Sequence, residues 1–375
     1  MAGIRLLDTG LVYRNPVPNV RSRHAYFPST VELPNRELVV TMDVGSAMEA
    51  LDVRSYVCRS HDGGRTWTEP TIIFEPDLKT TPSSTTCRSC GLADGSLLGL
   101  MTFFDRSRSN EGLANPATEG FVRTEFSLVK SHDGGRTWSA PRICRLPLEW
   151  HSFESCSPIV CLDDRRWLLP TSLWRGWEGR CPYGMRAVAF TSDDSGATWT
   201  GSSEVMNLWS RETACWEQKQ ALLSTGHLFA ICWAYDYRAR KSLRNHYAIS
   251  NNRGESFEPP RESPLCGETC SPLALTGNRV LFVYRRTDER GLWAHLAEIS
   301  GDTWTPLEDA ALWGSKVVSY TQRSETSMFE ELSTLQFGYP QLTRLSTGEI
   351  FIVFWCVEDC VSNIRWLKLE VEDLA

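Results

Sequence analysis

The sequence predicts an all-β protein built from a repeated sheet unit, and two observations support this fold class. The octapeptide Ser-His-Asp-Gly-Gly-Arg-Thr-Trp occurs twice unchanged, at Ser60–Trp67 and Ser131–Trp138, and altered copies follow at Ser192–Trp199 and Ser250–Phe257. The copies begin 71, 61 and 58 residues apart, which is typical of a structural repeat. Between them, runs rich in β-branched and aromatic residues follow polar turns, as strands do.

Each octapeptide has the chemistry of a self-contained turn. Asp62 can accept hydrogen bonds from N–H groups of its own loop. Gly64 permits the positive φ that a tight hairpin needs, and Trp67 offers a large apolar face for packing. We therefore expect these loops to stabilise hairpins rather than to bind a ligand.

The octapeptide resembles the S-x-D-x-G-x-T-W motif of the sialidase (BNR, Asp-box) superfamily, and the resemblance covers nearly the whole chain. It implies a six-bladed β-propeller of four-stranded antiparallel blades, in which each box joins the third and fourth strands away from the catalytic face. Six blades of about 60 residues would match the spacing of the copies. We therefore expect residues 1–375 to form a single sialidase-like domain.

The strands can be assigned in order around such a ring. The expected second strands are Glu37–Met42, Leu97–Phe104, Trp167–Leu173, His227–Ala234, Arg279–Tyr284 and Glu349–Trp355. The expected inner strands are Pro28–Leu33, Cys87–Leu92, Pro158–Leu162, Gln218–Leu223, Pro272–Leu275 and Pro340–Leu345. Ile4–Tyr13 should form the outer strand of the last blade, near the final strand-like run Ile364–Val371, because such closure removes free sheet edges.

Composition narrows the partners and the location. A net charge of −7 with no basic stripe argues against nucleic acid and anionic membranes as partners. No apolar run reaches the length of a transmembrane helix, and the first residues lack the apolar core of a secretory signal. With 13 cysteines in no disulfide-type spacing, we expect a cytoplasmic protein with reduced thiols. Cys87-x-x-Cys90 lacks a clear second pair, so we expect neither metal nor cofactor; the oligomeric state stays open.

Candidate site residues follow from the geometry of a propeller, where the starts of the inner strands converge on one mouth of the tunnel. Counting back ten residues from the apolar residue that opens each second strand puts the inner strands in register. The residues just before that register position are Phe27, Thr86, Ser157, Glu217 and Tyr339, and Ser271 fills the fifth blade by analogy.

The resemblance assigns catalytic roles to three residues. Sialidases use a tyrosine nucleophile at the start of the last inner strand, which corresponds to Tyr339, and an activating glutamate in the fourth blade, which corresponds to Glu217. A carboxylate within hydrogen-bond reach can take the phenol proton. The family's general acid lies about eleven residues before the first box, where this chain has Glu49, with Asp52 as the fallback.

The arginines with which sialidases hold the sugar carboxylate are partly missing. Guanidinium groups bind carboxylates bidentately and stay charged. This chain has Tyr26 in place of the first arginine, Asp43 near the second expected position and Ala234 near the third, although Arg238 or Arg285 could reach the site. The substrate should therefore differ from a typical sialoside.

Hydrogen-bonding groups around the first three blades complete the candidate binding site, and they suit a neutral sugar or a differently placed acid. They are His24, Tyr26, Asp43, Arg88 and Glu154. The first interpretation is an exo-acting retaining glycoside hydrolase acting on a carbohydrate. A lyase or inverting hydrolase of uronate-containing glycans, with Arg88 on the carboxylate, and a non-catalytic carbohydrate-binding propeller remain alternatives, because function depends on the site and not on the fold.

Overall fold

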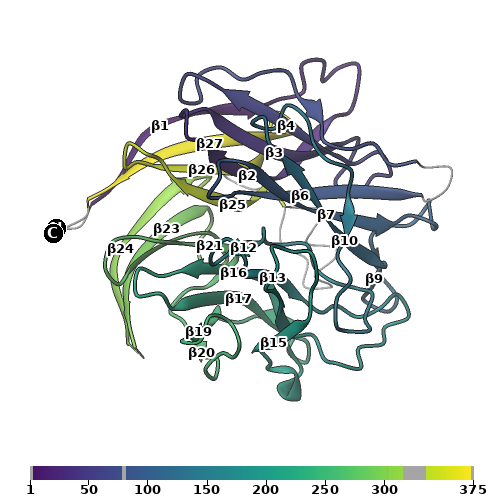
Figure 1. The fold of residues 1–375 in the computed structure, drawn as a ribbon, viewed down its shortest axis with the longest axis vertical. Coiled ribbons are helices and arrows are strands. Elements are labelled where there is room, and N and C mark those ends of the chain that lie inside the picture. The colour runs from purple at the N-terminus through teal and green to yellow at the C-terminus, as the bar shows by residue number, and fades with distance from the viewer. Residues whose placement is uncertain (1–2, 78–81, 302, 316–334, 373–375) are drawn as a thin grey trace.

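The computed structural model describes residues 3–77, 82–301, 303–315 and 335–372, and it is a six-bladed β-propeller. The sheets are arranged in a ring with their inner strands towards the centre (Figure 1). Each blade is an antiparallel sheet, and one 3₁₀ turn, Trp209–Arg211, precedes the fourth blade.

The first three blades follow the chain order closely. Blade one contains β2 (His24–Glu32), β3 (Leu38–Gly45), β4 (Arg54–Ser60) and β5 (Thr71–Ile72). Blade two contains β6 (Ser83–Gly91), β7 (Leu97–Asp105), β10 (Thr124–Ser131) and β11 (Arg142–Ile143), with a small hairpin of β8 (Ala114–Asn115) and β9 (Gly120–Phe121) between them. Blade three contains β12 (Val160–Cys161), β13 (Trp167–Ser172), β14 (Ala187–Ser192) and β15 (Gly201–Met206).

The other three blades complete the ring. Blade four contains β16 (Thr213–Leu222), β17 (Leu228–Asp236), β19 (His246–Ser250) and β20 (Arg261–Glu262), with β18 (Lys241–Ser242) beside β17. Blade five contains β21 (Gly267–Ala274), β22 (Arg279–Arg286), β23 (Leu292–Ser300) and β24 (Thr303–Trp313). Blade six contains β25 (Phe337–Arg344), β26 (Ile350–Glu358), β27 (Val361–Val371) and β1 (Ile4–Tyr13).

The ring is closed by the first strand, as the sequence predicted. β1 pairs antiparallel with β27, from Ile4 opposite Val371 to Tyr13 opposite Ile364. This pairing gives blade six its outer strand from the other end of the chain (Figure 1). The first strand of the propeller and its last strand therefore belong to the same sheet.

The octapeptides form the expected turns between third and fourth strands. In the first copy, the Thr66 N–H and hydroxyl donate to the Asp62 carboxylate at 2.9 and 2.6 Å, and the Gly64 N–H donates to Ser60 Oγ at 2.9 Å. Gly64 has a φ of +98°, a conformation that favours glycine. The indole of Trp67 donates to the Gly64 carbonyl at 2.9 Å, so this turn is held by its own side chains.

Most inner strands are interrupted by a bulge near their start. In blades one, four, five and six the register between inner and second strand shifts by one residue. The bulges place Phe27, Glu217, Thr269 and Tyr339 at φ values of 49 to 53°. Blade two has no such shift, and β6 pairs regularly with β7. Bulges of this kind redirect side chains next to functional sites, and these four open towards the same end of the ring.

Candidate active site

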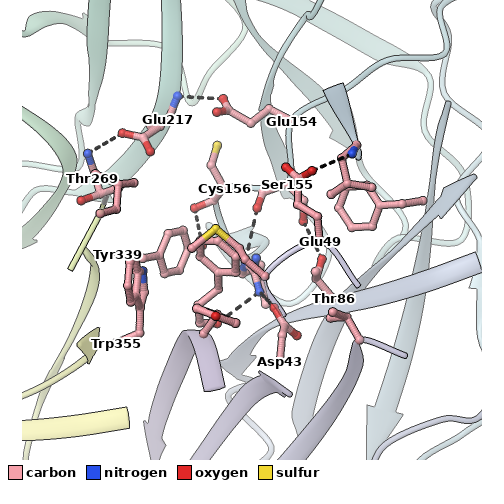
Figure 2. A pocket seen from close by; sticks show the side chains of 18 of the residues that line it. Asp43, Glu49, Thr86, Glu154, Ser155, Cys156, Glu217, Thr269, Tyr339 and Trp355 are labelled. Carbon is pink, nitrogen blue, oxygen red and sulfur yellow. Dashed lines mark hydrogen bonds and ion pairs between the residues drawn. The ribbon is translucent and has the colours of Figure 1, made fainter. Parts of the chain in front are cut away.

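A cavity of about 210 Å³ lies at the end of the propeller opposite the octapeptide turns, and all six blades contribute to its wall. Aromatic and carboxylate side chains dominate the lining (Figure 2). Site residues proposed from sequence that line it are Tyr26, Asp43, Glu49, Arg88, Glu154, Glu217, Arg285 and Tyr339. Two others lie elsewhere: His24 contacts Ser22 and the Ser362 N–H, and Arg238 lies in an exposed turn after β17.

The bulges explain how equivalent positions on different blades reach one cavity. Glu217, Thr269 and Tyr339 each occupy the left-handed position of a bulge and each lines the cavity. In blade five this position belongs to Thr269, not to Ser271, because the bulge there comes two residues earlier than analogy suggested. Ser271 instead donates its hydroxyl to the Pro340 carbonyl.

Tyr339 is deeply buried, with 4% of its surface exposed. Its hydroxyl donates to the Cys156 carbonyl at 2.5 Å. Burial raises the pKa of this phenol well above its usual value, although the nearby Arg88 guanidinium acts in the opposite direction. A neutral phenol is a weak nucleophile. Attack by Tyr339 therefore needs a group that takes the phenol proton or stabilises the negative charge of the phenolate.

Glu217 lies in the same cavity, but its carboxylate bonds elsewhere. It accepts a hydrogen bond from the Thr269 N–H, and its own N–H donates to Glu154 Oε2 at 2.7 Å (Figure 2). Burial raises the pKa of Glu217 to about 7, and Arg285 partly offsets this increase. The hydrogen bond expected between Glu217 and Tyr339 is thus replaced by contacts to Thr269 and Cys156.

Glu154 is a second carboxyl with a raised pKa. Burial, followed by the charge of Glu217, raises its pKa to about 8. Two such neighbours cannot both ionise easily, so the pair holds a proton near neutral pH. A carboxyl that is protonated near its working pH can act as a general acid.

Both arginines of the cavity wall are already paired with carboxylates. Arg88 donates to Asp43 Oδ2 at 2.7 Å, and both side chains are almost fully buried. Asp43 also accepts hydrogen bonds from Ser55 Oγ at 2.9 Å and from the Cys87 N–H at 3.2 Å. In blade five, Arg285 forms an ion pair with Glu268. The wall therefore offers little uncompensated positive charge.

Glu49 reaches the cavity from the loop between β3 and β4. Its Oε2 accepts a hydrogen bond from the Leu113 N–H at 2.8 Å, and its carbonyl accepts one from Arg106 Nη2 at 2.9 Å. The contact ties blade one to the long insertion of blade two. Figure 2 shows Glu49 on the side of the cavity away from Glu217 and Tyr339.

Aromatic side chains supply the apolar part of the wall. Trp174, Trp233 and Trp355 line the cavity. Trp216 stacks beneath Trp174 with ring centroids 4.6 Å apart, so it supports the wall. Trp rings of this kind can stack on sugar rings.

Sequence reasoning missed at least two charged residues at the site, Lys219 and Glu268, the cavity-wall partner of Arg285. Lys219 follows the blade-four bulge in β16, and its ammonium nitrogen lies 3.7 Å from the centroid of the Tyr339 ring. A lysine two residues after Glu217, in an inner strand next to the expected site, was the available signal. Among the residues that the structure describes, no cluster of three or more His, Cys, Asp or Glu side chains is arranged to hold a metal ion.

A ring of six four-stranded blades, closed by the first strand and carrying a polar cavity at the bulged ends of its inner strands, defines a sialidase-type propeller. The chain belongs to the BNR repeat-like domain family, whose model matches residues 100–352. No curated protein sequence matches the chain. Within the described residues, no helix is both long and apolar enough to span a membrane.

Solved structures share this fold at low sequence identity. A protein of unknown function from Dyadobacter fermentans is 20% identical with a TM-score of 0.72, over 99% of this chain and all of that chain. The NanB sialidase from Streptococcus pneumoniae is 12% identical with a TM-score of 0.67, over 98% of this chain and 71% of that one. An α-L-arabinanase from Penicillium chrysogenum, complexed with arabinobiose, is 15% identical with a TM-score of 0.65, over 98% of each chain.

Proposed function

We propose that this protein is an exo-acting, retaining glycoside hydrolase that removes a neutral sugar from the end of a glycan. The observation that carries the proposal is the convergence of Tyr339, Glu217 and Glu49 on one cavity, the first two from equivalent bulges in blades six and four. Structural relatives that hydrolyse glycosides, a sialidase and an arabinanase, support the class of reaction.

The charge of the cavity supports a neutral substrate. Arg88 and Arg285 are each engaged by a buried carboxylate, and a sugar acid would have to displace one of these partners. Leaving Asp43 or Glu268 buried and unpaired would be costly. Neutral sugars instead use hydroxyl hydrogen bonds and stacking on aromatic rings, which the cavity offers through Glu154, Trp174 and Trp233.

In the proposed first step, the Tyr339 oxygen bonds to the anomeric carbon while the bond to the leaving oxygen breaks. Glu49 gives its proton to that oxygen, and Glu217 takes the phenol proton after its carboxylate turns away from the Thr269 N–H. In the second step Glu49 takes a proton from water, the water oxygen bonds to the anomeric carbon, and Tyr339 leaves and recovers its proton from Glu217. Two displacements retain the configuration.

A second candidate mechanism uses two carboxyl groups. The Glu217 backbone N–H donates to Glu154 Oε2 at 2.7 Å, and the pKa values of the Glu154 and Glu217 carboxyl groups are raised to about 8 and 7. One could act as general acid and the other as base or nucleophile, as in most glycosidases. Tyr339 would then contact the substrate without forming a covalent bond.

A panel of chromogenic neutral glycosides, with a sialoside included, tests the proposal on wild type, Tyr339→Phe and Glu154→Gln. Tyr13→Phe is the matched control, because Tyr13 is a buried tyrosine in the same blade, outside the cavity. We expect the wild-type protein to release the chromophore from one neutral glycoside. The rate of this release should fall at least about a thousandfold in Tyr339→Phe and not in the other variants.

Each other result points to a definite alternative. Near-normal activity of Tyr339→Phe with loss in Glu154→Gln would establish the two-carboxylate mechanism instead. Cleavage of the sialoside would refute a neutral substrate. Binding without release would favour a binding propeller, and an unsaturated, ultraviolet-absorbing product from a uronate-containing polysaccharide would favour a lyase.

A further inference from the structure

Lys219 is an unusual residue for the interior of an inner strand. Only 3% of its surface is exposed, and its ammonium nitrogen has no hydrogen-bond partner within the part of the chain that the structure describes. Burial of an unpaired ammonium group destabilises a fold, because the charge loses its hydration without gaining a partner. A methionine would fill similar space without that cost, so the lysine calls for a functional explanation.

The environment of Lys219 points to Tyr339. The ammonium nitrogen lies 3.7 Å from the centroid of the Tyr339 ring, and the Arg88 guanidinium carbon lies 4.9 Å from it. Arg88 is neutralised by Asp43, whereas Lys219 forms no ion pair among the described residues. A cation against an aromatic face is attracted to the ring, and it is attracted far more strongly when the ring carries the negative charge of a phenolate.

We propose that Lys219 is a positioning residue that acts through Tyr339, stabilising its phenolate when it attacks the sugar and again when it leaves. The inference rests on the proposed function of Tyr339 as the nucleophile. It adds a group that the tyrosine–glutamate pair lacks, because the Glu217 carboxylate is held by the Thr269 N–H and the Tyr339 hydroxyl by the Cys156 carbonyl.

Charge and protons balance in both displacement steps without a further reactant. As the phenol gives its proton to Glu217, negative charge develops on the Tyr339 oxygen and spreads into the ring, where Lys219 opposes it. When water displaces the tyrosine, the electron pair of the broken carbon–oxygen bond returns to the phenolate, and Lys219 stabilises it until the proton comes back. Lys219 itself neither gains nor loses a proton in either step.

The effect of pH follows from the groups around Lys219. Those groups are Cys156 from blade three, Arg88 from β6, Glu217 from its own strand, Cys270 from β21 and Tyr339 from β25. Burial, reinforced by Arg88, lowers the pKa of Lys219 to about 7 despite the opposing effect of the acidic groups. The ammonium charge is therefore present below about pH 7 and is lost as the pH rises through that value.

The experiment compares Lys219→Met and Lys219→Arg with wild type. Lys130→Met is the matched control, since Lys130 also lies over an aromatic ring, 5.0 Å from the Trp167 centroid, but outside the cavity. On the glycoside that the panel identifies, we expect kcat to fall about 10- to 100-fold in Lys219→Met with little change in KM. Lys219→Arg should recover most of the loss, and Lys130→Met should behave as wild type.

A second measurement does not depend on turnover. Tyr339 is replaced by 2,3,5,6-tetrafluorotyrosine, whose phenol ionises below neutral pH in water, so that its titration reaches the range in which Lys219 is still charged. Its pKa is followed by fluorine NMR with Lys219 present and with Lys219→Met. We expect the pKa to be higher by about one unit or more in Lys219→Met. An unchanged pKa would overturn the inference even if the enzyme is active.

The two proposals can fail separately. If no glycoside is cleaved but the pKa of the fluorotyrosine depends on Lys219, the proposed function fails and the electrostatic coupling stands. If a glycoside is cleaved and Lys219→Met has wild-type kcat, the hydrolase stands and the role of Lys219 is refuted. Removal of an unpaired buried charge should not unfold the protein, which circular dichroism of Lys219→Met checks.

Discussion

The two ends of the propeller use carboxyl groups in opposite ways. At the octapeptide end, hydrogen bonds from the Thr198 side chain and N–H lower the pKa of Asp194 to about 2. At the cavity end, burial raises the pKa of Glu217 to about 7 and that of Glu154 to about 8. The difference lies in the partners, because each turn aspartate is satisfied within its own loop, whereas the glutamates meet across blades with few donors.

This contrast separates carboxylates that hold a turn from carboxyl groups that can exchange a proton. A carboxylate that is saturated by local N–H and O–H donors is stable as an anion and has no capacity for a substrate. A desolvated carboxyl keeps its proton near neutral pH and can exchange it. Substitutions at the cavity end should therefore change activity and pH dependence, and those at the turn end should change stability alone.

Among the substitutions that compare carboxyl groups at the two ends, Glu217→Gln should produce the largest effect. The amide oxygen can still accept from the Thr269 N–H, so the fold should be kept, but the proton acceptor is lost. We expect kcat/KM to fall about 10²- to 10⁴-fold. Glu204→Gln, an exposed glutamate on β15 that pairs with Arg186, is the matched control and should leave kcat/KM unchanged. Retention of activity within about threefold in Glu217→Gln would remove this residue from the mechanism.

Glu154→Gln should change how stability depends on pH. The folded pKa of Glu154 is about 8 and its ordinary value is 4.5. Between these values the folded state binds more protons than the unfolded state, so stability falls as the pH rises, at up to about 1.4 kcal/mol per pH unit. Urea unfolding at pH 5 and pH 8 should show a smaller loss in Glu154→Gln than in wild type. Equal losses would mean that Glu154 ionises normally in the folded protein.

Asp133→Ala should have a smaller effect, confined to stability. It removes the acceptor of hydrogen bonds from Ser131 Oγ and from the N–H groups of Arg136 and Thr137. We expect a loss of about 1–3 kcal/mol in the free energy of unfolding, with kcat/KM unchanged below the unfolding temperature. A change in kcat/KM would contradict the separation of the two ends.

Asp133→Asn should have the smallest effect. The fourth copy of the octapeptide already has an asparagine at the equivalent position, and Asn252 accepts from the Ser250 hydroxyl at 2.9 Å and from the Ser256 N–H at 3.0 Å. The same bonds can form at residue 133, so we expect a loss below about 1 kcal/mol. A loss as large as that of Asp133→Ala would show that charge, and not geometry, holds the turn.

Much of the fold was predictable because its signals are local. The turn residues of the octapeptides and the polar turns before the second strands depend on near neighbours, and β3, β7, β17, β22 and β26 lie where the sequence placed them. Five of the six inner strands were predicted to start too late; that of blade three, β12, begins at Val160, two residues later than predicted. In four of the five the first residues precede a bulge such as the one between Trp216 and Lys219, and a bulge breaks the alternation by which strands are recognised.

Much of the cavity lining was predictable from sequence, but the contacts of its side chains were not. Counting back from the second strands predicted that Glu217 and Tyr339 line one cavity, because the symmetry of a propeller fixes where each inner strand starts. Their hydrogen bonds depend on backbone groups of other blades, the Thr269 N–H and the Cys156 carbonyl, which no local pattern reveals. Lys219 was missed for the same reason, since its contact with the Tyr339 ring comes from a neighbour 120 residues away in the chain.

The closure of blade six has a consequence for folding during synthesis. Among the strands of the propeller β1 is synthesised first, whereas its partner β27, which ends at Val371, is synthesised last. The apolar residues of β1 therefore remain without their native partner while the other five blades are synthesised. Pairing over such a sequence separation is slow, and an unpaired strand exposes the nascent chain to wrong partners. A circular permutant that joins β1 directly behind β27 should fold faster, because its last blade would become an ordinary local meander.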